Sequence, residues 1–95
     1  RKPWENWYLE AVQTNNILID VNLKNVDKNH TVFENKDVWK IYLAMDYGNG
    51  HFRSSHIVSF NSENMTVTTK RGSIYKLGEA FNDKQIENLE FYFEE

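Results

Sequence analysis

The stretch that decides the fold is Trp39-Lys40-Ile41-Tyr42-Leu43-Ala44-Met45-Asp46-Tyr47-Gly48-Asn49-Gly50. From Trp39 to Tyr47 its larger apolar side chains fall at every second position, which is the period of a β-strand with one buried face. A helix would scatter the same side chains around its circumference. The glycines and the asparagine that follow tolerate the positive φ of a tight reversal. The stretch therefore predicts a strand that ends in a hairpin turn.

Towards the C-terminus the same pattern continues. We expect three further short strands at about residues 52–60, 65–70 and 73–77, separated by polar turn sequences. Residues 38–78 are thus predicted to form a run of antiparallel strands. After Gly78, Asp83 is a plausible N-cap, and Ile86, Leu89 and Phe93 share one helical face, which favours a short C-terminal helix. A strand at residues 91–93 is the alternative, because aromatic residues favour sheets.

Towards the N-terminus a second alternation predicts a half-buried strand at residues 16–24. Its apolar members are Ile17, Ile19, Val21 and Leu23. Residues 4–12 are rich in aromatic side chains and fit either a strand or a short helix, and we prefer the strand. Residues 25–37 are polar and form the longest loop, in which Val32 and Phe33 are expected to anchor the chain to the core.

These elements predict an α+β, mainly β, fold. We expect a strongly curved antiparallel sheet or small open barrel of about five to six strands with a short C-terminal helix. The chain has 95 residues, of which 15% are aromatic. This length fits one domain, residues 1–95, with a single core.

Composition excludes several classes of site. The chain has no cysteine, which rules out a disulfide framework, a cysteine zinc site and a thiol nucleophile. We expect no cofactor and no metal. The apolar runs are far shorter than the roughly 20 residues that span a bilayer, so we expect no membrane association. The chain begins at Arg1, which leaves open whether a leader has been removed.

Charge is distributed unevenly along the chain. The net charge is −3, which argues against general binding to nucleic-acid phosphates. Between Tyr47 and Gly78, however, four cations accompany the single acid Glu63. The strongest candidate for a ligand or partner site lies in this segment. It consists of Arg53, Ser55, His56, Lys70, Arg71, Tyr75 and Lys76. The alternative is that these are ordinary solvated residues of hairpin tips and strand edges.

The histidines of this segment do not suggest catalysis or metal binding. In a regular strand His51 and His56 lie on opposite faces, and neither has a carboxylate nearby in sequence to orient it. Ser54 and Ser55 precede His56, but adjacent strand side chains diverge. Tyr42 and Tyr75 could stack on a base, although cross-strand packing is the more common role of such residues.

Two segments carry a family resemblance. Residues 48–60 join a turn glycine to a Ser54-Ser55-His56-Ile57 strand, and the hairpin Thr69-Lys70-Arg71-Gly72-Ser73-Ile74-Tyr75-Lys76-Leu77-Gly78 follows. Together they resemble small bacterial domains found among integron gene-cassette proteins. Arg71 stands where that group usually has serine, and one extra residue separates Ser55 from Ile57. The resemblance implies a mobile-element protein of unassigned activity, cytoplasmic and often self-associating, and it brings no catalytic residues.

The sequence favours a non-enzymatic binding or interaction protein. We expect a homo-oligomer that associates through exposed strand edges or aromatic surface, and a separate protein partner is also possible. Three tryptophans in a short chain support this, since aromatic residues are enriched at interfaces. The alternative is binding of nucleic acid or an anionic ligand through the basic face of residues 47–78. An enzyme with a site between subunits is a third possibility that no group of residues recommends.

Overall fold

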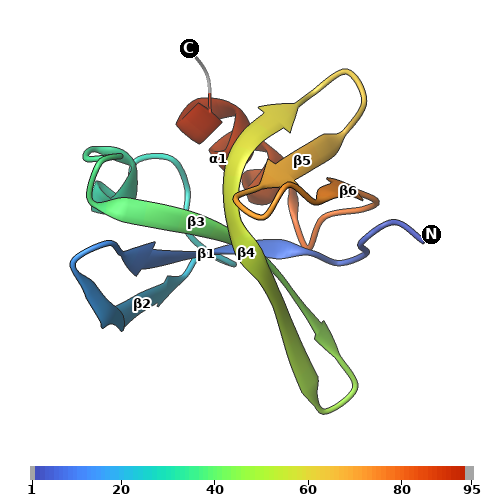
Figure 1. Ribbon diagram of the computed structural model, residues 1–95, viewed down its shortest axis with the longest axis horizontal. Coiled ribbons are helices and arrows are strands. Elements are labelled where there is room, and N and C mark those ends of the chain that lie inside the picture. Colours follow the sequence, from blue (N-terminus) through green and yellow to red (C-terminus); the bar gives the residue numbers. More distant parts are fainter. Residues whose placement is uncertain (1, 94–95) are drawn as a thin grey trace.

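The protein is built on one curved antiparallel sheet. The computed structural model describes residues 2–93. Its elements are β1 (Tyr8–Gln13), β2 (Asn16–Asn22), a 3₁₀ helix (Thr31–Phe33), β3 (Trp39–Tyr47), β4 (Gly50–Asn61), β5 (Thr66–Thr69), β6 (Ile74–Lys76) and α1 (Asp83–Phe93). The strands lie in the order β2-β1-β3-β4-β5-β6 and do not close into a barrel (Figure 1). The predicted fold class is confirmed.

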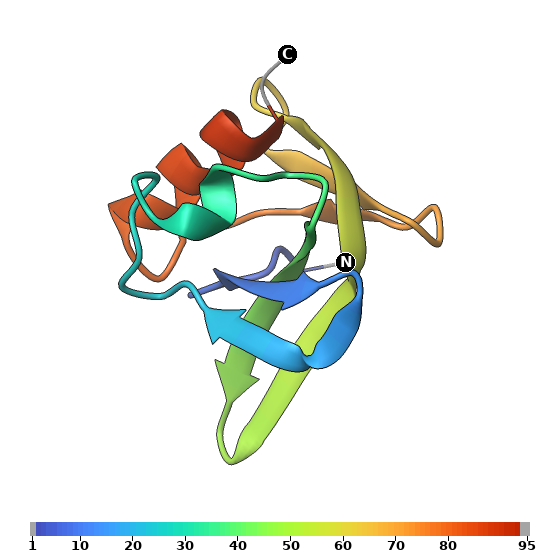
Figure 2. The ribbon, with the colours of Figure 1, turned by 90° about the vertical axis from the view of Figure 1, so that its left-hand side faces the viewer.

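Strand β4 gives the sheet its curvature. The strand pairs with β3 through its first half and with β5 through its second half, and both pairings contain a register shift. An extra residue in one strand of a pair bends that strand and increases its twist. As a result the β3–β4 hairpin projects away from the rest of the molecule, while the other end of β4 turns towards β5 (Figures 1 and 2).

Strand β2 differs from the half-buried strand that its alternation predicts. Val12 of β1 pairs with Asp20, but the next β1 residue, Gln13, pairs with Asn16. Three consecutive residues therefore have no partner on β1: Ile17, Leu18 and Ile19. They bulge out of the strand and are exposed. Only the later part of the segment packs as expected, with Leu23 fully buried.

The N-terminal segment reaches the far end of the sheet. The strand expected at residues 4–12 begins only at Tyr8. Before it, Trp4 and Trp7 form isolated parallel bridges with Leu77 and Ala80, just after β6. The indole Nε1 of Trp7 donates to the Gly78 carbonyl at 3.1 Å. These contacts tie the segment before β1 to the segment after β6.

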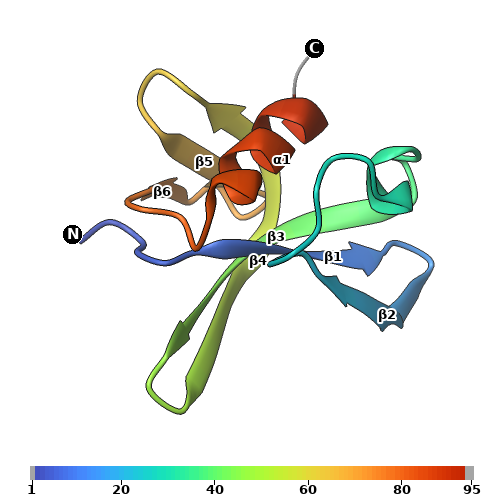
Figure 3. The same cartoon turned by 180° about the vertical axis from the view of Figure 1, so that it is seen from behind.

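Helix α1 covers the concave side of the sheet next to β4 (Figure 3). Leu89 is fully buried, and Ile86 and Phe93 pack against the core, so the predicted helical face is confirmed. Asp83, expected as the N-cap, is instead the first residue of the helix. The core below contains Trp7, Leu9, Ala11, Leu23, Val32, Phe33, Ile41, Leu43, Ile57, Val67 and Leu77. Within residues 2–93 no helix is long and apolar enough to cross a membrane.

The long loop is anchored as predicted. Val32 and Phe33 lie in the 3₁₀ helix and are buried. Phe33 meets the rings of Phe91 and Tyr92 edge-on, each at a centroid distance of 6.1 Å. Such edge-to-face pairs are favourable. The loop thereby packs against the last turn of α1.

The tryptophans do not form the exposed aromatic surface that the sequence suggested. Trp7 is completely buried, and Trp4 and Trp39 pack against the core. The short chain thus uses all three indoles for its own stability. The large apolar side chains that remain most exposed are Leu18, Ile17, Tyr47 and Ile74.

Candidate functional site

Polar side chains gather on the face of the sheet opposite the core. In β1, Leu9 and Ala11 point into the core, so Tyr8 and Glu10 point to the other face. The pairing of β1 with β3 sets Glu10 opposite Tyr42. The pairing of β3 with β4 sets Asp46 opposite His51. Strands β1, β3 and β4 therefore contribute to one group of polar residues, and Asp20 of β2 joins it by pairing with Arg53.

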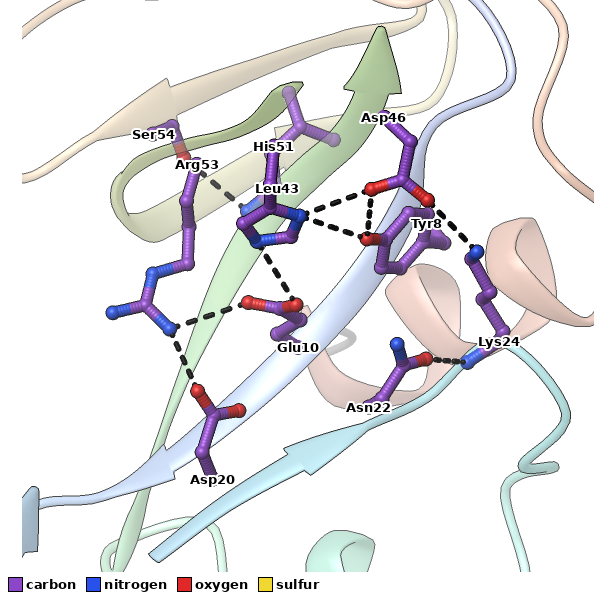
Figure 4. Close-up of polar contacts among 10 residues, drawn as sticks. All are labelled: Tyr8, Glu10, Asp20, Asn22, Lys24, Leu43, Asp46, His51, Arg53 and Ser54. Atoms are coloured by element: carbon purple, nitrogen blue, oxygen red, sulfur yellow. Dashed lines mark hydrogen bonds and ion pairs between the residues drawn. The ribbon is translucent and has the colours of Figure 1, made fainter. Parts of the chain in front are cut away.

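Glu10 lies at the centre of this ion-pair network. It is only 6% exposed although it carries a carboxylate. Its Oε2 lies 3.2 Å from His51 Nε2, and its Oε1 lies 3.2 Å from Arg53 Nη1 (Figure 4). Buried charges are found where opposite charges compensate them, and here two β4 side chains do so.

A second carboxylate holds the opposite side of His51. Asp46 Oδ1 lies 3.0 Å from His51 Nδ1 and accepts a 2.8 Å hydrogen bond from the Tyr8 hydroxyl. Asp46 Oδ2 accepts from Lys24 Nζ at 2.9 Å. The bonds from His51, Lys24 and Tyr8 hold the pKa of Asp46 well below its usual range. The expectation that no carboxylate nearby in sequence orients His51 is wrong, because the hairpin pairs it directly with Asp46.

The geometry favours the charged form of His51. Its pKa is raised, chiefly by the hydrogen bond to Asp46 and further by Glu10. Both ring nitrogens face carboxylate oxygens, which is the environment of an imidazolium that donates on each side. Burial and the bond to Asp46 raise the pKa of Tyr8, so its hydroxyl stays protonated. These groups hold one another in place and leave no ring nitrogen of His51 free to accept a proton.

The network fixes Arg53 in a defined position. Besides Glu10, Arg53 Nη1 donates to Asp20 Oδ2 at 2.9 Å. The guanidinium carbon lies 4.5 Å from the centroid of the Tyr42 ring, a cation–π arrangement. An arginine held by two carboxylates and an aromatic ring has lost most of its rotational freedom. The side chain is therefore preorganised at the surface of β4.

An irregularity in β4 turns His56 to the same face. Tyr42 pairs with His56 and Ala44 pairs with Arg53, so β4 contains one more residue than β3 between these pairs. His51, Arg53 and His56 consequently share a face, and the prediction that the two histidines lie on opposite faces is wrong. Burial lowers the pKa of His56, and Lys40 and Lys70 lower it further.

Four of the seven predicted site residues line one hollow beside Arg53. We call it the β4–β6 hollow; its lining residues are Tyr42, Arg53, Ser54, Ser55, Arg71, Ser73 and Tyr75. It is a depression open to the surface, with a volume of about 500 Å³. Of the other predicted residues, Lys70 lies beside His56, since its amide donates to the His56 carbonyl at 2.9 Å. Lys76 lies elsewhere and donates to the Asn64 carbonyl.

Sequence reasoning missed the acidic half of the network. Glu10 and Asp20 come from strands distant in sequence from Arg53, and no motif links them. A signal for Glu10 was nevertheless present, because it alternates with the apolar residues Leu9 and Ala11. A signal for Asp46 was its position across the Gly48–Gly50 turn from His51. Among residues 2–93 no group of histidine and carboxylate side chains is arranged to hold a metal ion.

A second surface feature lies at the edge of the sheet. The side chains of the bulge in β2 are highly exposed: Ile17 79%, Leu18 87% and Ile19 41%. We call these three residues the apolar bulge. Strand β2 has one neighbour, β1, so its other edge is open. At the opposite edge, Ile74 of β6 is also exposed.

Comparison of the chain with protein-family models, with curated proteins and with solved structures finds no match. The resemblance to integron gene-cassette domains therefore stays a prediction from residues 48–60 and 69–78.

Proposed function

We propose that this protein is a small non-enzymatic binding protein that self-associates through the apolar bulge of β2. The observation that carries the proposal is the exposure of three consecutive aliphatic side chains at an open sheet edge. Single exposed apolar residues are common on protein surfaces, but adjoining ones mark interaction sites more often. Full burial of one such side chain is worth about 1.5–3 kcal/mol.

A second copy of the chain is a suitable partner for this surface. In a twofold dimer the same patch meets itself, so each copy buries its own bulge against that of the other. The bulge interrupts the regular edge, and we therefore expect packing of side chains rather than a continuous sheet across the two copies. The neighbouring charge does not oppose this contact, because Asp20 is already paired with Arg53 of its own chain.

Size-exclusion chromatography with light scattering tests the proposal. We expect an oligomer mass for the wild type at high micromolar concentration and a monomer mass for Leu18→Asn. The matched control is Ile74→Asn, which removes an exposed isoleucine from the opposite edge and is expected to keep the oligomer. A monomeric wild type, or equal loss of association in both variants, contradicts the proposal.

The proposal includes a biological setting taken from the resemblance of residues 48–60 and 69–78. In that setting the chain is a single bacterial domain, encoded on a mobile gene cassette and acting in the cytoplasm. Recombination sites flanking the gene would support this origin. Their absence, with the gene at a fixed chromosomal position, would contradict the cassette origin but not the self-association.

A further inference from the structure

The β4–β6 hollow contains the donor groups that bind a phosphate. Arg71 is exposed in the turn between β5 and β6 and forms no ion pair with another described residue. Guanidinium groups bind phosphate through paired, charge-assisted hydrogen bonds. Ser55 and Ser73 supply hydroxyl groups to the same lining. The Ser54 hydroxyl has a structural role, since it accepts from the Leu43 amide at 3.2 Å and donates to the Ser55 carbonyl.

The charge of the hollow is positive. Its lining contains two arginines and no acidic residue. The carboxylates that pair with Arg53 belong to β1 and β2 and are not part of the lining. Only Nη1 of Arg53 makes those ion pairs. Beside the hollow, Lys40 and Lys70 lie close enough to His56 to lower its pKa. Glu10 and Asp20 offset the charge of Arg53, so Arg71 and these two lysines supply the positive charge near the hollow.

The size of the hollow fits a small molecule. Its volume of about 500 Å³ lies within the range of ordinary ligand sites. Tyr42 and Tyr75 contribute aromatic surface that a ring of the ligand can contact. A nucleic-acid chain needs a row of cations along its backbone, but Lys76 lies outside the hollow and the protein has a net charge of −3.

We infer that the β4–β6 hollow binds a small phosphorylated molecule that carries a ring, such as a mononucleotide or a sugar phosphate. Arg71 binds the phosphate, with Ser55 and Ser73 as further donors. Arg53 supports the phosphate from the side of β4. Glu10, Asp20 and Tyr42 hold the Arg53 guanidinium in position for this. The inference does not depend on self-association, because the apolar bulge of β2 contributes no residue to the hollow.

Amide chemical shifts measured by NMR test this inference, with adenosine 5′-monophosphate as the probe. We expect the shifts to change at residues 53–55 and 71–75, with a Kd of about 1 mM for a generic probe. Adenosine, which lacks the phosphate, is expected to cause no such changes at the same concentration. The absence of changes with adenosine 5′-monophosphate at about 10 mM, ten times that Kd, would overturn the inference.

Two charge-matched variants distinguish a defined site from general attraction. Arg71→Gln and Lys76→Gln each remove one positive charge from the β5–β6 hairpin, but only Arg71 lines the hollow. Arg71→Gln is expected to raise the Kd about tenfold, and Lys76→Gln less than about twofold. Unchanged amide shifts elsewhere in the spectrum confirm that both variants are folded. Equal weakening by both variants would overturn the inference.

A thymidine oligonucleotide serves as the competing class of ligand. The inference predicts that it binds no more tightly, per phosphate, than the mononucleotide. Tighter binding of the oligonucleotide that weakens steeply with salt would assign the surface to nucleic acid and overturn the small-molecule site.

Discussion

Replacement of Gln85 by leucine tests how the helix is attached to the sheet. Gln85 is completely buried in the first turn of α1. Its Oε1 accepts a 2.9 Å hydrogen bond from the Leu9 amide, and its Nε2 donates to the Leu23 carbonyl at 2.9 Å and to the Lys24 carbonyl at 3.1 Å. The Leu9 carbonyl accepts a hydrogen bond from the Leu23 amide, just beyond the end of β2. On this side of β1, Leu9 is therefore the residue at which the pairing with β2 stops. The Gln85 amide thus continues the ladder where β2 ends.

The cost of Gln85→Leu follows from these partners. The Leu23 carbonyl keeps a bond from the Val26 amide, and the Lys24 carbonyl keeps one from Asn82 Nδ2. The Leu9 amide loses the bond that it makes to Gln85 while remaining buried, which costs about 1–3 kcal/mol. The leucine recovers part of this by apolar burial, but the two carbonyls each lose a second bond. We therefore expect a loss of about 2 kcal/mol in the free energy of unfolding.

Urea unfolding followed by tryptophan fluorescence measures this loss. For a chain of this size about 2 kcal/mol corresponds to a decrease of about 8–16 °C in Tm. The control is Lys84→Leu, which introduces the same residue at an exposed position of the same helix turn and is expected to leave stability nearly unchanged. A Gln85→Leu variant within about 0.5 kcal/mol of the wild type would refute the reasoning.

Three further outcomes are expected. The pKa of His51 is higher in the folded than in the unfolded chain, so protonated His51 stabilises the fold. This stabilisation is complete at pH values below the unfolded pKa of about 6.5 and is lost as pH rises through the folded pKa. The stability difference between wild type and His51→Asn is therefore larger at pH 5.5 than at pH 8.5 in urea titrations, and a constant difference would contradict this. Thr69→Val removes a buried hydroxyl that has no hydrogen-bond partner within residues 2–93, and it should raise the free energy of unfolding by about 1 kcal/mol. A lower free energy of unfolding in urea titrations would show that the hydroxyl does have a partner. Burial, with a smaller effect of Asp37, raises the pKa of Tyr92 to about 12, and its hydroxyl lies within hydrogen-bond distance of the Lys36 and Trp39 carbonyls, to one of which it donates. Tyr92→Phe should cost about 1 kcal/mol by thermal unfolding and remove an ionisation step near pH 12 from the ultraviolet titration, and persistence of that step would exclude Tyr92 as its source.

The sequence is sufficient to predict most of the sheet. Alternation along Trp39–Tyr47 and the glycines that follow locate the central hairpin, and Gly48 adopts the positive φ of 57° that such a turn requires. These features are local, because period and turn chemistry are written in neighbouring residues. The helical face with Leu89 and the anchor at Phe33 were predictable for the same reason.

Register shifts limit what alternation can predict. The apolar pattern from Ile17 to Leu23 is regular, yet the chain bulges at Ile17 and only the later residues pack. In β4, the added residue moves His56 to the face of Arg53. A shift of one residue exchanges the faces of all following side chains. The position of a bulge depends on the partner strand, so a single strand's sequence does not reveal it.

The buried polar residues were unpredictable for a different reason. Gln85 and Glu10 are buried because backbone groups and charged side chains distant in sequence bind them. Composition and periodicity assign such residues to the solvent. The basic segment was more predictable, since four of its seven candidate site residues line one hollow: Arg53, Ser55, Arg71 and Tyr75. They meet there because the two hairpins that carry them are adjacent in the sheet.

Self-association through the apolar bulge is the central claim, and a dilution series of amide NMR spectra tests it most directly. The account predicts that dilution from millimolar to low micromolar concentration shifts the amides of residues 16–20 and leaves those of β6 unchanged. It also predicts that Leu18→Asn removes this dependence. Spectra that do not change on dilution, or changes centred on β6, would contradict the claim.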